Sequence, residues 1–217
     1  MNSEDIIALT DVRKTFRDFW LRPTVAAVDG LSLTVRRGEV FGLLGPNGSG
    51  KSTTIKMILG LLDPSAGAVR MFGLPPRSTE ARRRLGYLPE LSYLHPFLTA
   101  RETLLYYAGL CGLNRRVAAS RADELLVLDE PTSGLDPIST KEVKTLVKAL
   151  SAGGMTILMT SHLLADAEDV CDRVMILDRG RSVAEGRVDE LGTSLEEFFL
   201  AKVGDVGSFK LAGFLKG

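Results

Sequence analysis

The sequence GPNGSGKS at residues 45–52 is the strongest indication of the fold, because it fits the pattern G-x-x-x-x-G-K-[ST]. The apolar run EVFGLL at residues 39–44 precedes it and is typical of a short buried strand. Residues 52–62 follow, with Ile55, Ile58, Leu59 and Leu62 at helical spacing, and predict an amphipathic helix that ends at Asp63. A glycine-rich loop between a strand and a helix favours a phosphate-binding loop over an ordinary glycine-rich turn.

The loop residues have the chemistry that phosphate binding needs. Small residues let backbone N–H groups turn toward phosphate oxygens, and the helix N-terminus adds donors and partial positive charge. We expect Lys51 to reach the β- and γ-phosphates, the Ser52 hydroxyl to ligate Mg²⁺, and Thr53 to add a phosphate contact. The residues predicted to bind nucleotide here are Gly45, Pro46, Asn47, Gly48, Ser49, Gly50, Lys51, Ser52 and Thr53.

A second part of the site is predicted at LLVLDE, residues 125–130. A buried parallel strand delivers its following residues to the sheet edge where ligands bind in α/β proteins. Asp129 is placed to hold Mg²⁺ and Glu130 to orient or deprotonate the attacking water. A solvated Asp-Glu pair at a strand end is the alternative, and the phosphate loop disfavours it.

The bulk composition leaves room for one packed core and gives no electrostatic sign of a nucleic-acid partner. The chain has 217 residues, 45% hydrophobic, with 27 Lys plus Arg balanced by 27 Asp plus Glu. No apolar run reaches the roughly 18 residues of a membrane-spanning helix, and the N-terminus has no signal-peptide pattern. Any membrane role is therefore expected to come through a partner. Cys111 and Cys171 have no metal-type spacing and are expected to be free thiols.

The order of apolar runs predicts an α/β fold. Residues 125–128, 155–159 and 174–177 are typical of buried strands, with a helix around residues 140–150 between the first two. This alternation indicates a parallel sheet wrapped by helices. The runs at residues 6–9 and 31–35 predict earlier strands, and residues 82–84 are interpreted as a solvated helix face.

Together these motifs resemble the ABC transporter ATPases of the P-loop NTPase superfamily. Residues 45–53 match Walker A, residues 125–130 match Walker B, residues 133–136 match the D-loop and residues 160–162 match the switch-histidine segment, in the family's order. The resemblance implies a P-loop NTPase fold with an N-terminal antiparallel β subdomain and a helical subdomain. It further implies that Asp136 contributes to nucleotide binding and that His162 contacts the γ-phosphate, so that Glu130, His162 and Lys51 form the catalytic set.

Two matches depart from the family's usual residues. Residues 86–90 resemble the Q-loop, with Glu90 where glutamine is usual, so that a carboxylate is the candidate Mg²⁺ or water ligand. Phe16 lies where the family's adenine-stacking aromatic sits, although Phe19 or Trp20 also offers a ring face, and packing under the loop is the alternative for each.

One family element is missing from the sequence. The family has a helical subdomain and an LSGGQ signature between the Q-loop and Walker B, but residues 91–125 contain no such segment. Residues 124–126 are interpreted both as the end of a subdomain helix and as the start of the Walker B strand, which suggests an internal deletion. We expect an ATP-binding domain over residues 1–204, a truncated helical subdomain at about 91–124, and a loosely ordered tail at 205–217.

The sequence thus predicts the Mg-ATP-binding subunit of an ABC-type exporter, held at the cytoplasmic face of the membrane by a membrane-spanning transporter subunit. A second ABC ATPase domain, in a homodimer or heterodimer, is the other expected partner. The first alternative is a nucleotide-binding module with little or no ATPase activity, regulatory or a degenerate remnant, as the missing signature suggests. The second is a soluble ABC protein of translation or DNA repair, which a single short neutral chain fits poorly.

Overall fold

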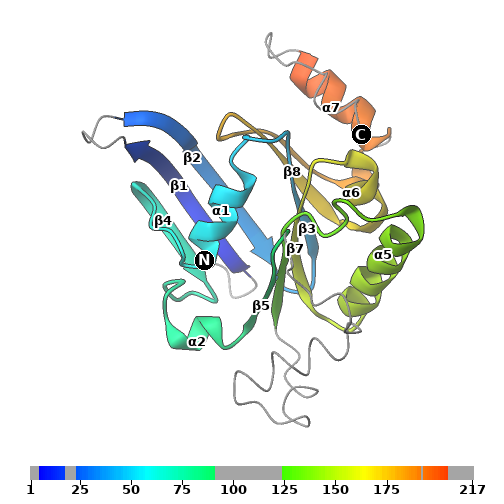
Figure 1. Cartoon of the computed structure of the whole chain (residues 1–217), viewed down its shortest axis with the longest axis horizontal. Helices are drawn as coiled ribbons and strands as arrows, with labels where there is room; N and C mark the ends of the chain where they lie inside the picture. The colour runs from blue at the N-terminus through cyan, green and yellow to red at the C-terminus, as the bar shows by residue number, and fades with distance from the viewer. Residues whose placement is uncertain (1–4, 18–22, 91–123, 192, 205–217) are drawn as a thin grey trace.

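The computed structural model describes residues 5–17, 23–90, 124–191 and 193–204 (Figure 1). The strand before the glycine-rich loop lies between two layers of hydrophobic core. This strand is β3 (Val40–Leu44), and all five of its residues are buried. Phe41 and Leu43 pack into the core shared with the first strands and α1, whereas Val40 and Leu44 pack into a second core on the opposite face. A strand buried on both faces has to be apolar at every position, which explains the continuous run in the sequence.

The central sheet confirms the predicted parallel arrangement. Its strand order is β5 (Leu85–Leu88), β6 (Leu125–Leu128), β7 (Thr156–Ser161), β3, β8 (Arg173–Asp178) and β9 (Arg181–Arg187). Every neighbouring pair is parallel except β8 with β9, which is antiparallel. The carboxyl ends of β6, β7 and β3 consequently lie side by side at one edge.

The predicted N-terminal antiparallel subdomain is also confirmed. It consists of β1 (Asp5–Arg17), β2 (Pro23–Arg36) and β4 (Ala66–Met71), in the order β2-β1-β4. The strands β1 and β2 extend well past the expected runs at residues 6–9 and 31–35. Their outer halves are held by hairpin pairing, such as Phe16 with Val25, and not by burial, so hydrophobicity alone did not reveal them.

Helices cover both faces of the central sheet. Figure 1 shows α1 (Lys51–Ile58) between the two sheets, and α5 (Pro137–Ala152) with α6 (Leu164–Val170) on the opposite face. The other helices in the described residues are α2 (Thr79–Arg82), the 3-10 turn η1 (Val188–Glu190) and α7 (Leu195–Gly204). None of the helices in the described part of the chain is long and apolar enough to cross a membrane.

The helix after the glycine-rich loop ends earlier than expected. The prediction continued it to residue 62, but α1 stops at Ile58. Gly60 adopts a φ of 67°, the left-handed conformation that commonly terminates helices, and the N–H of Leu62 bonds back to the Lys56 carbonyl at 3.1 Å. Leu62 still packs against the core, which explains why the apolar spacing suggested a longer helix.

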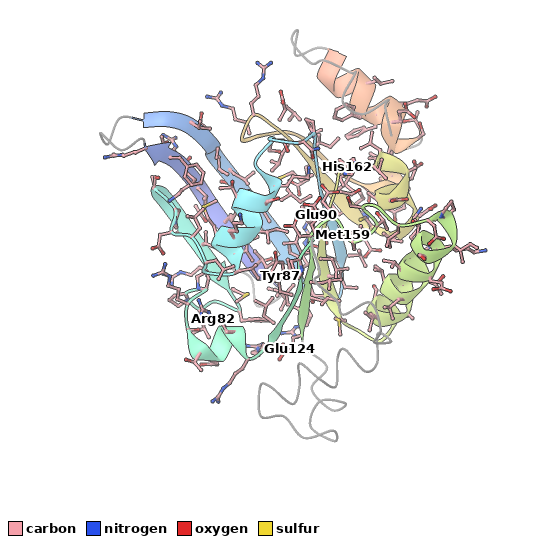
Figure 2. All side chains as sticks on the ribbon, viewed as in Figure 1. Arg82, Tyr87, Glu90, Glu124, Met159 and His162 are labelled. Carbon is pink, nitrogen blue, oxygen red and sulfur yellow. The ribbon has the colours of Figure 1, made fainter. Side chains whose placement is uncertain are left out.

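The structure confirms that the Walker B strand starts within residues 124–126, but it shows no helix at these three residues. Glu124 lies in a bend, and Leu125 and Leu126 belong to β6. The Glu124 carboxylate accepts hydrogen bonds from Arg84 at 2.6 and 3.0 Å and from Arg37 at 2.8 Å. Figure 2 places Glu124 at the opposite end of the central sheet from the histidine after β7.

Arg82 and Arg83 are exposed at the end of α2, as expected, and only Arg84 departs from the predicted solvated helix face. Arg84 lies beyond the end of α2, and its guanidinium stacks 3.8 Å from the centre of the Phe72 ring while it pairs with Glu124. The predicted subdomain remnant before Glu124, the tail at residues 205–217, and Phe19, Trp20 and Cys111 lie outside the described residues.

Replacing Glu124 with Gln removes the ion pairs with Arg37 and Arg84 and should lower the free energy of unfolding at pH 7. The expected loss is only about 1 kcal/mol, because water screens this half-exposed carboxylate. Hydrogen bonds from Arg84 and Arg37 lower the pKa of Glu124 from 4.5 to about 2. The stabilisation is therefore present above about pH 4.5 and is lost as the pH falls toward 2. Urea unfolding from pH 7 to pH 2.5 measures it, with Glu142→Gln on α5 as control. A difference between wild type and Glu124→Gln that stays constant over this range would contradict the assignment.

Candidate functional site

Three loops meet at the carboxyl edge of the central sheet, where β3, β7 and β6 end as neighbours. Residues 45–50 follow β3, Asp129 and Glu130 follow β6, and His162 follows β7. A hydrogen bond of 3.3 Å from the Gly45 N–H to the Ser161 carbonyl joins the first loop to the end of β7. The parallel topology therefore brings together three motifs that are far apart in the sequence.

The glycine-rich loop depends on close backbone approaches. A Cβ on Gly45 would lie 2.4 Å from the Leu177 carbonyl oxygen, and a Cβ on Gly50 would lie 2.5 Å from the Ala27 carbonyl oxygen. Gly50, with a φ of 109°, is the N-cap of α1, and no side chain caps this helix. Ser49 Oγ is buried without a hydrogen-bond partner, the one such side-chain atom in the described part of the chain. The loop thus presents donors and the positive end of a helix.

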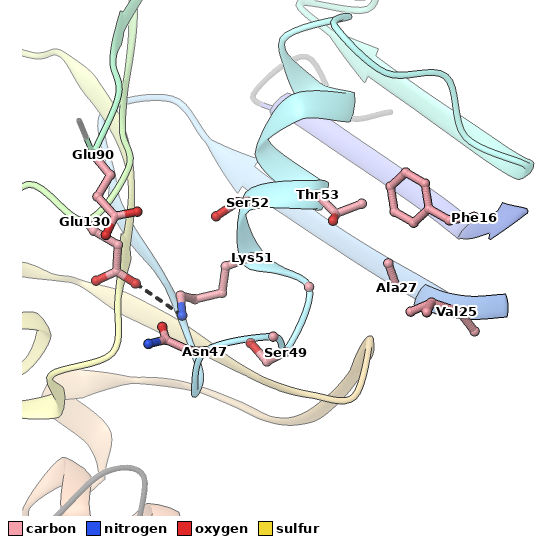
Figure 3. Close-up of a pocket in the computed structure, with 13 residues that line it drawn as sticks. Phe16, Val25, Ala27, Asn47, Ser49, Lys51, Ser52, Thr53, Glu90 and Glu130 are labelled. Atoms are coloured by element: carbon pink, nitrogen blue, oxygen red, sulfur yellow. Dashed lines mark ion pairs between the residues drawn. The ribbon is translucent and has the colours of Figure 1, made fainter. Parts of the chain in front are cut away.

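Lys51 is held at the centre of the site. Its side chain is only 5% exposed, and its ammonium donates to the Gly45 carbonyl at 2.6 Å and to the Pro46 carbonyl at 3.3 Å. The same ammonium lies 3.1 Å from a carboxylate oxygen of Glu130, as the dashed line in Figure 3 marks. The structure therefore brings the predicted phosphate-binding cation and the predicted general base into direct contact.

The two carboxylates after β6 are buried and face different partners. Asp129 is 6% exposed and Glu130 is 7% exposed. Glu130 adopts a φ of 51°, a left-handed conformation that is strained for a residue other than glycine and often occurs at functional sites. Burial raises the pKa of the nearby Tyr87 phenol, and the negative charge of Asp129 raises it further.

Sequence reasoning missed the role of Thr160, the fifth residue of β7. Its hydroxyl accepts a hydrogen bond of 2.8 Å from the Glu130 N–H and donates one of 2.7 Å to Asp129 Oδ1. Thr160 is fully buried. The available signal was a hydroxyl residue directly after the apolar run at residues 157–159, at the edge where the sites of α/β proteins form.

His162 reaches the same network from β7. Its Nδ1 lies 2.7 Å from a carboxylate oxygen of Glu130, and its backbone N–H donates to the same oxygen at 3.1 Å. The Glu130 carboxylate thus lies between Lys51 on one oxygen and His162 on the other.

A cavity of about 460 Å³ extends over the glycine-rich loop from Phe16 to Glu130 (Figure 3). The residues that line it are Phe16, Val25, Ala26, Ala27, Asn47, Gly48, Ser49, Gly50, Lys51, Ser52, Thr53, Glu90 and Glu130. Phe16 and Val25 lie at one end of the close-up, whereas Glu90 and Glu130 lie at the other, beyond Lys51. Most of the predicted binding residues are thus gathered around one cavity, with an aromatic end and a charged end.

Asp136 is not brought to this cavity. It caps the N-terminus of α5, where its carboxylate accepts hydrogen bonds from the N–H groups of Ile138 at 2.9 Å and Ser139 at 3.1 Å. Hydrogen bonds from Ser139, first from its hydroxyl and then from its backbone N–H, lower the pKa of this exposed carboxyl. In the single chain Asp136 therefore has a helix-capping role, and its nucleotide-binding role stays a prediction.

The cavity fits a nucleotide triphosphate in size and in chemistry. Its volume lies within the range of small-molecule sites, and the uncapped helix N-terminus with Lys51 supplies the donors that phosphate groups need. The described residues contain no group of three or more His, Cys, Asp or Glu side chains that could hold a metal alone. Mg²⁺ does not require one, because it is usually bound by one or two protein groups together with phosphate oxygens. The Ser52 hydroxyl and the Asp129 carboxylate are of the type it prefers.

Substituting alanine for two glycines of the loop should distinguish the loss of stability caused by backbone strain from the loss caused by a steric clash. Gly48→Ala should cost about 1–2 kcal/mol, because its φ of 82° is unfavourable for alanine but no atom lies within 4 Å of the new Cβ. Gly50→Ala should cost about 3 kcal/mol or more, since its Cβ also meets the Ala27 carbonyl. Urea unfolding of both variants checks this. Equal losses of stability would show that the approach to Ala27 is not a constraint.

Comparisons with known proteins agree with this geometry. The profile of the family described as "ABC transporter" matches residues 28–178. An uncharacterised ABC transporter ATP-binding protein of Nostoc sp. is 36% identical over 230 residues, which cover 88% of this chain and 69% of that protein. The Nod factor export ATP-binding protein I of Burkholderia lata is 39% identical over 198 residues, covering 73% of this chain and 65% of that protein.

A solved structure of the ATP-binding subunit of an ABC transporter is similar over most of both chains. It superposes with a TM-score of 0.74 at 27% identity, covering 91% of this chain and 99% of the other. The chain spans about two thirds of the length of the curated relatives that it matches.

Proposed function

Because this chain belongs to the family of ABC transporter ATP-binding proteins, we propose that it binds Mg-ATP in the cavity between Phe16 and Glu130 and powers a membrane exporter. The observation that carries the proposal is the contact of the buried Lys51 ammonium with Glu130 at the charged end of that cavity. The direction of transport is suggested by the relatives named for Nod factor export.

Each residue of the site has its own role in the transfer of a phosphoryl group to water. The ammonium of Lys51 and the amides of the loop hold phosphate oxygens, and Phe16 offers a ring face to the adenine. Ser52 and Asp129 would hold Mg²⁺, which supplies positive charge against the phosphates when it is bound. Glu130 accepts a hydrogen bond from the attacking water and then accepts the proton of that water. His162 keeps the Glu130 carboxylate in position until the γ-phosphate replaces this carboxylate as the partner of His162.

Glu90 is the remaining charged group at this end of the cavity. Its exposed carboxylate lies near Glu130 in the close-up and adds negative charge where the family usually has a neutral amide. We propose that it contributes a ligand to Mg²⁺ or to a water of the metal, because an additional carboxylate near phosphate is tolerated only with a cation between them.

The proposed partners follow from what the chain lacks by itself. A subunit with a nucleotide site needs a membrane-spanning transporter subunit to move a substrate, and we propose a place at the cytoplasmic face of the membrane through that subunit. A second ABC ATPase domain, identical or different, is the other proposed partner. A net charge of zero gives no reason to add nucleic acid to these partners.

A specific observation favours the second candidate, a nucleotide-binding module with little or no turnover. The alignment with the Nostoc protein extends over 230 residues, but it covers 88% of this 217-residue chain, which is about 190 residues. About 40 residues of the relative therefore have no counterpart in the aligned part of this chain. The same comparison with the Burkholderia lata protein, 198 residues against 73% of the chain, gives a similar difference. This supports an internal deletion, as does the absence of an LSGGQ segment at residues 91–125.

Binding should be detected as a rise in thermal stability. Mg-ATP at about 100 times its dissociation constant should raise the unfolding midpoint by about 5–10 °C, since only the folded chain binds it. Lys51→Ala should remove this shift, whereas Lys56→Ala, at an exposed lysine of the same helix, should keep it. Each variant is compared with its own ligand-free midpoint, because alanine at position 51 leaves Glu130 without its ammonium partner. A shift that persists in Lys51→Ala would contradict the proposed site.

Turnover should be weak in the purified chain. Without signature-motif donors at the γ-phosphate, hydrolysis should run about 100-fold or more below that of a complete ABC ATPase. Phosphate release, with Glu130→Gln as the background, measures it. Robust hydrolysis that Glu130→Gln abolishes would reject the low-turnover candidate and restore the full ATPase.

A further inference from the structure

Thr160 occupies a position between the two acidic residues of the site. The parallel pairing of β6 with β7 sets Leu128 opposite Met159, so Thr160 is the next residue along β7 and faces Asp129, the first residue beyond β6. On its other side, the pairing of β3 with β7 sets Thr160 opposite Leu43, two residues before the glycine-rich loop. The side chain is therefore fixed between neighbouring strands and is fully buried.

The hydroxyl of Thr160 has one proton, and the backbone N–H of Glu130 determines which acceptor receives it. The Glu130 N–H donates to the hydroxyl oxygen at 2.8 Å, so this contact uses a lone pair and leaves the hydroxyl proton available. That proton is donated to Asp129 Oδ1 at 2.7 Å. The bond fixes the rotation of the Asp129 carboxylate and engages one oxygen, which leaves Oδ2 as the oxygen available to a cation.

A second consequence concerns the backbone of Glu130. Its left-handed φ of 51° directs the side chain back to Lys51 and His162. Its N–H donates to the Thr160 hydroxyl, so a single side chain supports the orientation of both acidic residues.

We propose that Thr160 is a positioning residue for metal binding: its hydroxyl orients the Asp129 carboxylate toward Mg²⁺ and supports the strained backbone of Glu130. This inference rests on the proposed Mg-ATP function of the site. Partners that orient a metal-ligating carboxylate typically change metal affinity by about 10- to 100-fold when they are removed. A threonine buried only for packing would be replaceable by the isosteric valine with no specific effect on the metal.

The experiment measures ADP binding by calorimetry in EDTA and over a series of Mg²⁺ concentrations, with wild type, Thr160→Val and Thr160→Ser. ADP is used because it is not hydrolysed. Valine keeps the shape of threonine but has no hydroxyl, whereas serine keeps the hydroxyl. We expect Thr160→Val to bind ADP as wild type does in EDTA, but to need about 10- to 100-fold more Mg²⁺ for half of the metal-dependent gain in affinity. Thr160→Ser should restore the Mg²⁺ requirement to within about threefold of wild type.

The results distinguish failure of the positioning role of Thr160 from failure of the proposed function. A wild-type Mg²⁺ requirement in Thr160→Val, or equal losses in the valine and serine variants, overturns the positioning role while the nucleotide site stands. Wild type that binds ADP without any effect of Mg²⁺ also overturns it. Wild type that binds no ADP in either condition rejects the proposed function itself. If the valine variant does not fold, Thr160→Cys replaces it, because a thiol is a weak donor; a wild-type Mg²⁺ requirement in that variant overturns the proposal.

Discussion

The ion pair between Lys51 and Glu130 is the interaction on which the site depends. Its two charges are 5% and 7% exposed, so each has lost most of its water and depends on the other and on local hydrogen bonds. Carbonyls of Gly45 and Pro46 satisfy the ammonium, and His162 satisfies the second carboxylate oxygen. Glu130 is therefore the counter-ion of Lys51 in this structure. A phosphate that binds Lys51 has to replace that carboxylate, which frees it to act on water.

The antiparallel subdomain is coupled to this site through backbone contacts. The Ala27 carbonyl lies against both Gly50 and Gly180, at distances that only glycine permits. Gly180 in turn donates to the Ser49 carbonyl at 2.8 Å and accepts from the Asp29 N–H at 2.8 Å. The β1–β2 hairpin, which presents Phe16, is thus held to the phosphate loop through β2.

Local sequence patterns predicted the parts of the fold that are buried on both faces, such as β3 and β6, and the loop that joins β3 to α1. They did not predict β4 and β5, because most of their residues are exposed or half-buried and leave no continuous apolar run. The end of α1 at Gly60 was missed because Leu62 continues the apolar spacing after the helix has stopped. The partners of Glu130 and Asp129 depend on which strands are neighbours in the sheet, so the role of Thr160 emerges only from the topology.

A crystal structure of the chain with Mg²⁺ and a non-hydrolysable ATP analogue would show whether phosphate replaces Glu130 as the partner of Lys51. We expect the triphosphate to lie over the glycine-rich loop, with Lys51 Nζ bonded to phosphate oxygens and separated from the Glu130 carboxylate. Mg²⁺ should be bound by Ser52 and lie on the side of Asp129 Oδ2. A structure in which the nucleotide binds elsewhere, or in which Lys51 and Glu130 remain paired beside the bound triphosphate, would contradict this expectation.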